Sequence, residues 1–294
     1  MVATGKALFL AIALSVAGFG QSPLESVRAD LEARFAEVPG VFAAAVIDFE
    51  TGDTLFIRAD RVFHAASTMK TPVAFEVARQ AERGWRSLDD SILVRNQFVS
   101  IEDGSPFSLE VTRDGGERLY EHLGGKRTLR DLTYDMLVYS SNLATNLVID
   151  LVSADSVRRT MREIGAEGVN VLRGVEDLKA YEAGKNNTTT ARGLAILFRE
   201  IYAGDYLAET SRAFLLDILK DQHYNSVIPA KLPDGATVYH KTGSISIVHH
   251  DSGVVEKPDG RAYAVVLLCG DFEDRASAID AMADASRMIY DAIE

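Results

Sequence analysis

Residues 237–268 read TVYHKTGSISIVHHDSGVVEKPDGRAYAVVLL, and this stretch decides the fold class. It contains three runs that are typical of β-strands, at 237–241, 245–254 and 263–268. Thr242-Gly243 and Lys257-Pro258-Asp259-Gly260 are turn-forming sequences, and they predict the two connections. Because such short connections join antiparallel neighbours, we expect an antiparallel group of strands here.

Strand patterns recur near the other end of the chain. Residues 41–47 and 54–57 predict two strands, and Thr51-Gly52-Asp53 between them supports a hairpin. Helical spacing of apolar residues precedes them at 22–37 and closes the chain at 276–293. The simplest packing joins both ends into one antiparallel sheet that the terminal helices cover.

The middle of the chain is mostly helical in pattern. Between 97 and 117, Gly104, Pro106, Gly115 and Gly116 indicate a loop or a small hairpin. Ser153 is an expected N-cap, and Asn187-Thr188-Thr189-Thr190 supplies N-cap hydroxyls for the helix that follows. We therefore expect an α+β fold, with a sheet lobe (about 21–66 and 220–294) and an inserted all-helical lobe (about 67–219). A site at the seam between the lobes is expected. Apolar spacing predicts the helices at 67–83, 129–138, 143–152, 153–164, 191–202 and 211–219.

Composition excludes several classes of function. The chain has 294 residues and a net charge of −12, which argues against binding nucleic acid or an anionic membrane surface. His249-His250-Asp251 has the residue types of metal ligands, and no other His, Cys or Asp spacing in the sequence supports a zinc site. Neighbouring side chains on a strand point to opposite faces, so we expect no metal and no cofactor.

The first 20 residues are typical of a secretory signal peptide. Lys6 precedes the apolar run 7–17, which is too short to span a bilayer, and Gly18-Phe19-Gly20 supplies small residues before a cleavage point. We expect a periplasmic or secreted monomer without a stable membrane anchor, its catalytic domain spanning 21–294. Cys269, the single cysteine, follows an apolar run and is expected to be a buried structural thiol.

Ser67-Thr68-Met69-Lys70 opens a predicted helix and suggests nucleophilic chemistry. A serine hydroxyl needs a base within hydrogen-bond reach, and positions i and i+3 of a helix share a face. Burial, with Lys241 as a second cation nearby, would lower the pKa of Lys70 enough to make it that base. A backbone N–H at the start of the helix can also stabilise an oxyanion. The alternative is that Ser67 is an N-cap and Lys70 a solvated lysine.

Two further sequences complete the pattern. In Ser140-Ser141-Asn142, Ser140 would carry a proton to a leaving nitrogen and Asn142 would hold a substrate amide. The alternative is a capping role for these residues, and the two roles are compatible.

In Lys241-Thr242-Gly243-Ser244, the charge and hydroxyls would bind a carboxylate. Gly243 would admit a ligand backbone, and the Ser244 N–H would be a second oxyanion donor. The alternative is an ordinary hairpin turn.

These three sequences, in this order, resemble the penicillin-recognising serine acyltransferases, and most closely the class A β-lactamases. The resemblance spans the mature chain and implies Ser-x-x-Lys at Ser67 and Lys70, Ser-x-Asn at Ser140 and Asn142, and Lys-Thr-Gly at 241–243. Asn146 also matches a helix position of class A enzymes. Ser141 stands where class A enzymes usually carry Asp.

The larger departure lies in residues 173–179, the stretch that corresponds to the Ω-loop of class A enzymes. Class A enzymes carry Glu-x-x-Leu-Asn there, and the resemblance implies that this glutamate activates the water that hydrolyses the acyl-enzyme. Counting back from Leu178, that position falls on Val175, with Glu176 one residue later and Lys179 in place of asparagine. Either Glu176 reaches the site through a slip in the loop, or deacylation is slow, or Lys70 serves both steps.

Three functions stay open at this point. The first is a secreted serine hydrolase that opens β-lactam amides through an acyl-enzyme on Ser67. The second is a D-alanyl-D-alanine peptidase or related esterase, a penicillin-binding protein whose substrate is a peptidoglycan-type peptide. The third is a sensor or inactive binding module that is acylated once or only binds.

Overall fold

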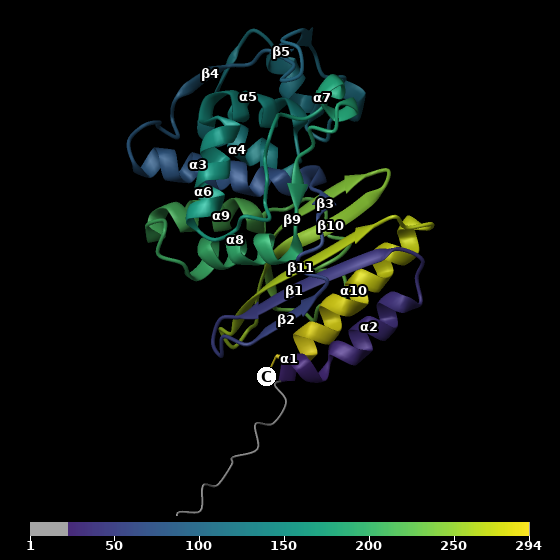
Figure 1. Ribbon diagram of the computed structural model, residues 1–294. Helices are drawn as coiled ribbons and strands as arrows, with labels where there is room; N and C mark the ends of the chain where they lie inside the picture. The colour runs from purple at the N-terminus through teal and green to yellow at the C-terminus, as the bar shows by residue number, and fades with distance from the viewer. Residues whose placement is uncertain (1–22, 294) are drawn as a thin grey trace, which may run out of the picture.

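The computed structural model describes residues 23–293 (Figure 1). The predicted signal peptide at 1–20 lies outside these residues. In the part of the chain from 23 to 293, no helix combines the length and apolar character needed to cross a membrane.

One five-stranded antiparallel sheet joins the two ends of the chain, as the sequence predicted. Its strand order is β2-β1-β11-β10-β9. Val41 pairs with Gly270 and Asp48 with Tyr263, so the first long strand lies directly beside the last. The mixed α+β architecture is therefore confirmed. The strands are β1 (Val41–Asp48), β2 (Thr54–Ile57), β9 (Thr237–Ile245), β10 (Val248–Glu256) and β11 (Ala262–Gly270).

The predicted turn at Thr242-Gly243 is wrong. Strand β9 continues to Ile245, and Ser244 and Ile245 pair with His249 and Val248 of β10. The chain turns at residues 246–247 instead. The whole Lys-Thr-Gly-Ser sequence is consequently extended backbone on the edge strand of the sheet, and the hairpin-turn alternative falls away.

Helices cover both faces of the sheet (Figure 1). The terminal helices α1 (Pro23–Ser26), α2 (Arg28–Ala36) and α10 (Arg275–Ala292) lie on one face. The helical middle of the chain lies on the other, and Ser153 and Thr190 cap α6 and α8 as predicted. Its helices are α3 (Lys70–Glu82), α4 (Leu129–Val138), α5 (Asn142–Val152), α6 (Ala154–Glu163), α7 (Leu178–Glu182), α8 (Ala191–Ala203) and α9 (Glu209–Lys220).

Short elements connect these layers. Residues 98–107 form a small hairpin, one of the two alternatives predicted for 97–117, and a two-residue strand pair lies just before the segment that leads into α3. The hairpin is β5 (Phe98–Val99) with β6 (Pro106–Phe107); the other pairs are β3 (Phe63–His64) with β8 (Thr188–Thr189) and β4 (Ser91–Leu93) with β7 (Lys126–Thr128). The 3₁₀ segments are η1 (Ala66–Met69), η2 (Val111–Arg113) and η3 (Glu117–His122).

The alternation of side chains along the central strands divides the core in two. Leu268 and its even-numbered neighbours on β11 pack toward the helical middle, while Cys269 and the odd-numbered residues pack toward the terminal helices. Cys269 is fully buried, and burial raises the pKa of its thiol to about 12. The prediction of a buried structural thiol is confirmed.

A buried ion pair inside the helical lobe gives a stability prediction. Glu76, fully buried on α3, accepts from Arg79 (3.1 Å), Gln80 (2.7 Å) and Thr160 (2.6 Å). We expect Glu76→Gln to lower the free energy of unfolding by about 3 kcal/mol, because it removes the buried carboxylate partner of Arg79 and leaves, among the described carboxylates, only the exposed Glu163 at 3.7 Å. Urea unfolding measures this, with exposed Glu167→Gln as the control. Equal midpoints for the two variants would contradict the prediction.

Candidate active site

Ser67 lies in η1, at the point where the chain enters α3. The alternative role of Ser67 as an N-cap falls away, because the α3 N-cap is Met69 and η1 begins at Ala66. A side chain at Gly243 would place a Cβ 2.9 Å from Thr68 N and 3.1 Å from Ser67 N. Gly243 therefore lets β9 lie directly against the backbone of η1. The close approach expected for a ligand is made by the protein's own backbone.

Lys70, the first residue of α3, is fully buried rather than solvated. Its ammonium donates to Ser140 O (2.6 Å), Ser140 Oγ (3.1 Å) and Asn142 Oδ1 (2.9 Å). Burial lowers the pKa of Lys70 to about 7, and the carboxylates of Asp114 and Glu176 oppose this shift. Among the described residues Lys70 makes no hydrogen bond to Ser67 Oγ. Such bonds often form only when substrate is present.

Lys241 is also fully buried, on β9. It donates to Ser140 Oγ (3.2 Å) and to Thr242 O (2.9 Å), so Ser140 contacts both lysines. Burial lowers the pKa of Lys241, and repulsion from Lys70 lowers it further. The expected effect of burial on the pKa of Lys70 is confirmed, whereas Lys241, the expected second cation, is not among the causes of that shift.

Within Ser140-Ser141-Asn142, one residue caps a helix and the other two face the site. Ser141, fully buried, is the N-cap of α5 and accepts from Ala144 N (3.2 Å). Ser140 precedes it with a φ of +58°, a conformation that side chains rarely adopt, and this turns its hydroxyl toward the lysines. Ser140 and Asn142 are thus left available for chemistry while the serine between them closes the helix.

Asp114 is a site residue that no motif in the sequence predicted. It follows η2 and is 8% exposed. Its carboxylate holds the start of α5, 28 residues away, through Asn142 N (2.8 Å) and Leu143 N (2.8 Å). It also accepts from Gly116 N (2.8 Å), Tyr120 OH (3.1 Å) and Ser141 Oγ (3.5 Å). The only local signal was Asp114-Gly115-Gly116, which suggests no more than a turn.

We expect Asp114→Asn to destabilise the protein by about 2 kcal/mol, because an amide cannot replace both oxygens that accept from the α5 N-terminus. The same change should lower kcat, since Asn142 begins that helix. Thermal unfolding and steady-state kinetics check both effects, with exposed Asp234→Asn as the control. A variant as stable as the parent would show that Asp114 does not anchor α5.

The Ω-loop delivers Glu176 to the site, although Val175 occupies the position where class A enzymes carry glutamate. Asn146 clamps the backbone of Val175 at N (2.7 Å) and O (3.0 Å). Glu176 has a φ of +60°, and its carboxylate accepts from Asn142 Nδ2 at 2.7 Å. Glu176 therefore lies at the site one residue after Val175, and Asn142 connects it with Lys70.

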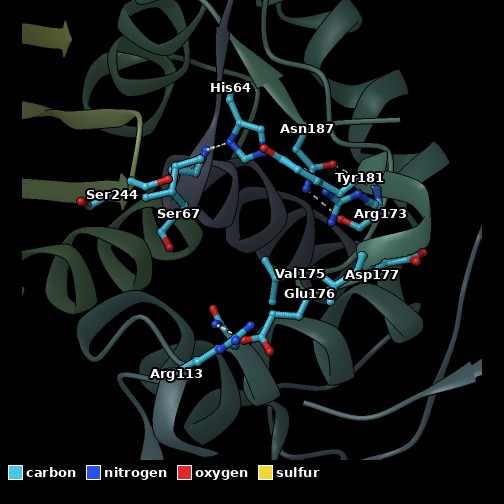
Figure 2. Close-up of a pocket in the computed structure, with 15 residues that line it drawn as sticks. His64, Ser67, Arg113, Arg173, Val175, Glu176, Asp177, Tyr181, Asn187 and Ser244 are labelled. Carbon is cyan, nitrogen blue, oxygen red and sulfur yellow. Dashed lines mark hydrogen bonds between the residues drawn. The ribbon is translucent and has the colours of Figure 1, made fainter. Parts of the chain in front are cut away.

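Two cavities meet at Ser67. The larger, about 450 Å³, lies between the Ω-loop and the end of β9. In Figure 2 Ser67 and Ser244 line one side of it, and Glu176 and Arg113 lie across from them. The smaller, about 260 Å³, continues past Ser140 and Thr242. A substrate can therefore extend in both directions from the serine.

The edge strand presents backbone donors to these cavities. Lys241 O accepts from Ser252 Oγ of β10, whereas Thr242 O accepts from Lys241 Nζ on the open side. Backbone groups alternate in direction along a strand, so Ser244, with the parity of Thr242, directs its N–H away from β10. The Ser244 hydroxyl accepts from Arg275 Nη1 (2.7 Å), a contact that the sequence did not suggest.

The two histidines on β10 diverge. His249 Nδ1 lies 3.1 Å from Ser244 Oγ, while His250 Nε2 lies 3.0 Å from His64 O. Within residues 23–293 no group of three or more His, Cys, Asp or Glu side chains is arranged to hold a metal ion.

The model of the beta-lactamase enzyme family matches residues 25–293 of this chain. The chain belongs to this family. A beta-lactamase of Bacillus licheniformis is 28% identical over 270 residues, which cover 90% of this chain and 82% of the relative. Membership confirms the resemblance drawn from the three sequences and makes the protein a β-lactamase-type serine hydrolase.

Solved structures agree. A beta-lactamase from Chitinophaga pinensis DSM 2588 has a TM-score of 0.79 at 25% identity, over 92% of this chain and 100% of that chain. A mutant of PBP-A, solved as an acyl-enzyme complex with penicillin G, has a TM-score of 0.76 at 26% identity, over 92% of this chain and 95% of that chain. This chain is thus similar in structure both to a beta-lactamase and to a PBP-A acyl-enzyme complex with penicillin G.

Proposed function

We propose that this protein hydrolyses β-lactam amides through an acyl-enzyme on Ser67. The observation that carries the proposal is the Ser140 hydroxyl, which lies 3.1 Å from Lys70 Nζ and 3.2 Å from Lys241 Nζ beside a cavity that reaches Ser67. A hydroxyl between two buried amines can receive a proton from one side and release it on the other.

Acylation begins with Lys70 in its neutral form. Lys70 accepts the Ser67 hydroxyl proton as the serine oxygen attacks the lactam carbonyl. The oxyanion that forms is stabilised by the N–H groups of Ser67 and Ser244. The proton passes through Ser140 to the lactam nitrogen as the C–N bond breaks. The Lys70 amine is then neutral again, and the acyl group is an ester of Ser67.

Binding uses the edge strand and α5. The substrate carboxylate lies against Lys241, Thr242 and Ser244, where its charge favours the protonated form of Lys241. Asn142 donates to the amide on the acyl side of the substrate. Gly243 keeps the strand close enough to η1 for the two oxyanion donors to act on one oxygen.

Deacylation depends on Glu176 in this proposal. Its carboxylate lines the larger cavity and is held by Asn142, from where it can take a proton from a water that attacks the ester. The predicted signal peptide at 1–20 favours export, and we propose a periplasmic or secreted monomer with residues 21–294 as one catalytic domain.

A second candidate is a D-alanyl-D-alanine peptidase or esterase that β-lactams inhibit. One observation favours it: Val175, which cannot act as a base, occupies the expected glutamate position and also lines the larger cavity. Slow deacylation would follow if Glu176 does not activate water. The likeness to a PBP-A acyl-enzyme complex supports keeping this candidate.

One experiment separates the candidates: a chromogenic cephalosporin with the purified mature protein, followed by absorbance and intact mass. Steady turnover with little adduct supports the hydrolase. One equivalent of colour and a persistent adduct would support the peptidase or a sensor instead. Neither turnover nor adduct would overturn the acyl-enzyme chemistry. Ser67→Ala is the control, and it should form no adduct in any case.

A further inference from the structure

The turn that presents Ser67 is closed by a histidine side chain. Ala66, directly before Ser67, has a φ of +46°, a conformation that L residues rarely adopt. Its backbone N–H donates to His64 Nδ1 at 3.0 Å. Strained backbone of this kind persists only where its surroundings fix it. The His64 ring supplies the hydrogen-bond acceptor at this point.

His64 is itself held from two sides. It pairs with Thr188 across the short β3–β8 ladder, and its carbonyl oxygen accepts from His250 Nε2 at 3.0 Å. His250 is fully buried, and burial lowers its pKa to about 4, so it is neutral near pH 7. Its Nδ1 accepts from Cys269 N at 3.3 Å, which places its ring proton on Nε2. The support of His64 therefore runs back to the central strand β11.

We propose that His64 is a positioning residue that holds the Ala66–Ser67 turn only while its imidazole is neutral. In the neutral ring Nδ1 has a lone pair for Ala66 N–H and Nε2 carries the hydrogen. Protonation adds a hydrogen to Nδ1, so that two donors face each other. The turn then loses its acceptor, and the Ser67 hydroxyl and N–H leave their reactive position. The readout of this proposal rests on the proposed acylation of Ser67.

The groups around His64 set the pH range of this effect. Burial lowers the pKa of His64 below its ordinary value of 6.5, and the positive charge of Arg173 lowers it further. Tyr181 of α7 contacts the ring edge-on, at 6.0 Å between centroids. Asp177, in the same cavity wall, is held by Ser100 Oγ (2.7 Å). Glu176 lines that wall as well and is bonded to Asn142, and His250 contacts His64 through the carbonyl.

The test is the acylation rate as a function of pH, measured by rapid mixing with a chromogenic cephalosporin. Below about pH 7, protonation of Lys70 should give the plot of log acylation rate against pH a slope of one, which we call the Lys70 limb. Below the pKa of His64 we expect a second limb, in which the slope is two because both groups are protonated. Near-ultraviolet circular dichroism over the same range shows that the fold is intact, and the series ends at about pH 5, above the titration of His250.

Two variants and a control make the test specific. His64→Asn keeps an acceptor but does not titrate, so it should act within about threefold of the parent near pH 7.5 and lose the second limb. His64→Leu has no acceptor and should acylate about 10–100-fold more slowly at every pH, with the Lys70 limb retained. His223→Asn, exposed and outside both cavities, should keep both limbs.

The role of His64 would be overturned by a parent enzyme with only the Lys70 limb, or by a His64→Asn variant that keeps the second limb. A His64→Leu variant as fast as the parent would do the same. Failure of the proposed function looks different, because a parent protein with neither colour change nor Ser67 adduct at any pH gives no acylation rate at all.

Discussion

Replacing Glu176 with glutamine is expected to slow hydrolysis of the acyl-enzyme by about 10²–10⁴-fold and to leave its formation nearly unchanged. Glutamine keeps the size of the side chain and a carbonyl oxygen that accepts from Asn142, but it cannot take a proton from water. The adduct on Ser67 should therefore accumulate. Intact mass during turnover of a chromogenic cephalosporin, with single-turnover kinetics for each step, measures the effect.

The matched control for this experiment is Glu182→Gln. Glu182 ends α7, a few residues after Glu176, and is exposed outside the cavities that reach Ser67. It should turn over like the parent. If Glu176→Gln also turns over like the parent, Glu176 is not the deacylation base, and Lys70 must serve both steps.

Replacing Lys70 with methionine is expected to slow formation of the acyl-enzyme by about 10²–10⁴-fold, because Ser67 loses its base. Methionine has nearly the length of lysine and is suited to a fully buried position, so the fold should be retained. The rate of adduct formation and the thermal midpoint measure the two effects separately. Lys220→Met, exposed at the end of α9, is the control.

The pH dependence of the parent enzyme tests the same role. Only the neutral amine can accept a proton, and burial lowers the pKa of Lys70 to about 7. The acylation rate should consequently rise with pH through about 7 and level off above it. A rate that stays flat from pH 6 to 9, or a Lys70→Met variant that acylates like the parent, would show that another group activates Ser67.

Local signals in the sequence predicted most of the elements. The helix over residues 129–138 has its predicted bounds, and Ser153 and Thr190 accept from the backbone N–H groups that an N-cap serves. The end of β9 was placed wrongly, because Thr242-Gly243 has the composition of a turn. Pairing with β10 overrides that preference, and pairing depends on residues that the local pattern does not contain.

The site was predicted only in part, again because local patterns do not contain the distant residues that complete it. The three sequences selected Ser67, Lys70, Ser140, Asn142 and Lys241, and the structure brings these residues together; their catalytic roles stay predictions. Asp114 was not predicted because it holds a helix that begins 28 residues later in the chain. The position of Glu176 was open because it depends on the path of the loop backbone, which Asn146 holds at Val175 from 29 residues away.

By itself the sequence determined the periodicities, the caps, the apolar strands and the residue types needed for acyl transfer, since each depends on neighbours within a few positions. Only the tertiary structure decided which amines are buried, and so which of them can act as bases. Lys241 and Ser140 are 101 residues apart, and Lys70 and Asn142 are 72 apart. Desolvation and hydrogen bonding between such distant groups arise when the sheet and the helical lobe pack, and no local pattern encodes them.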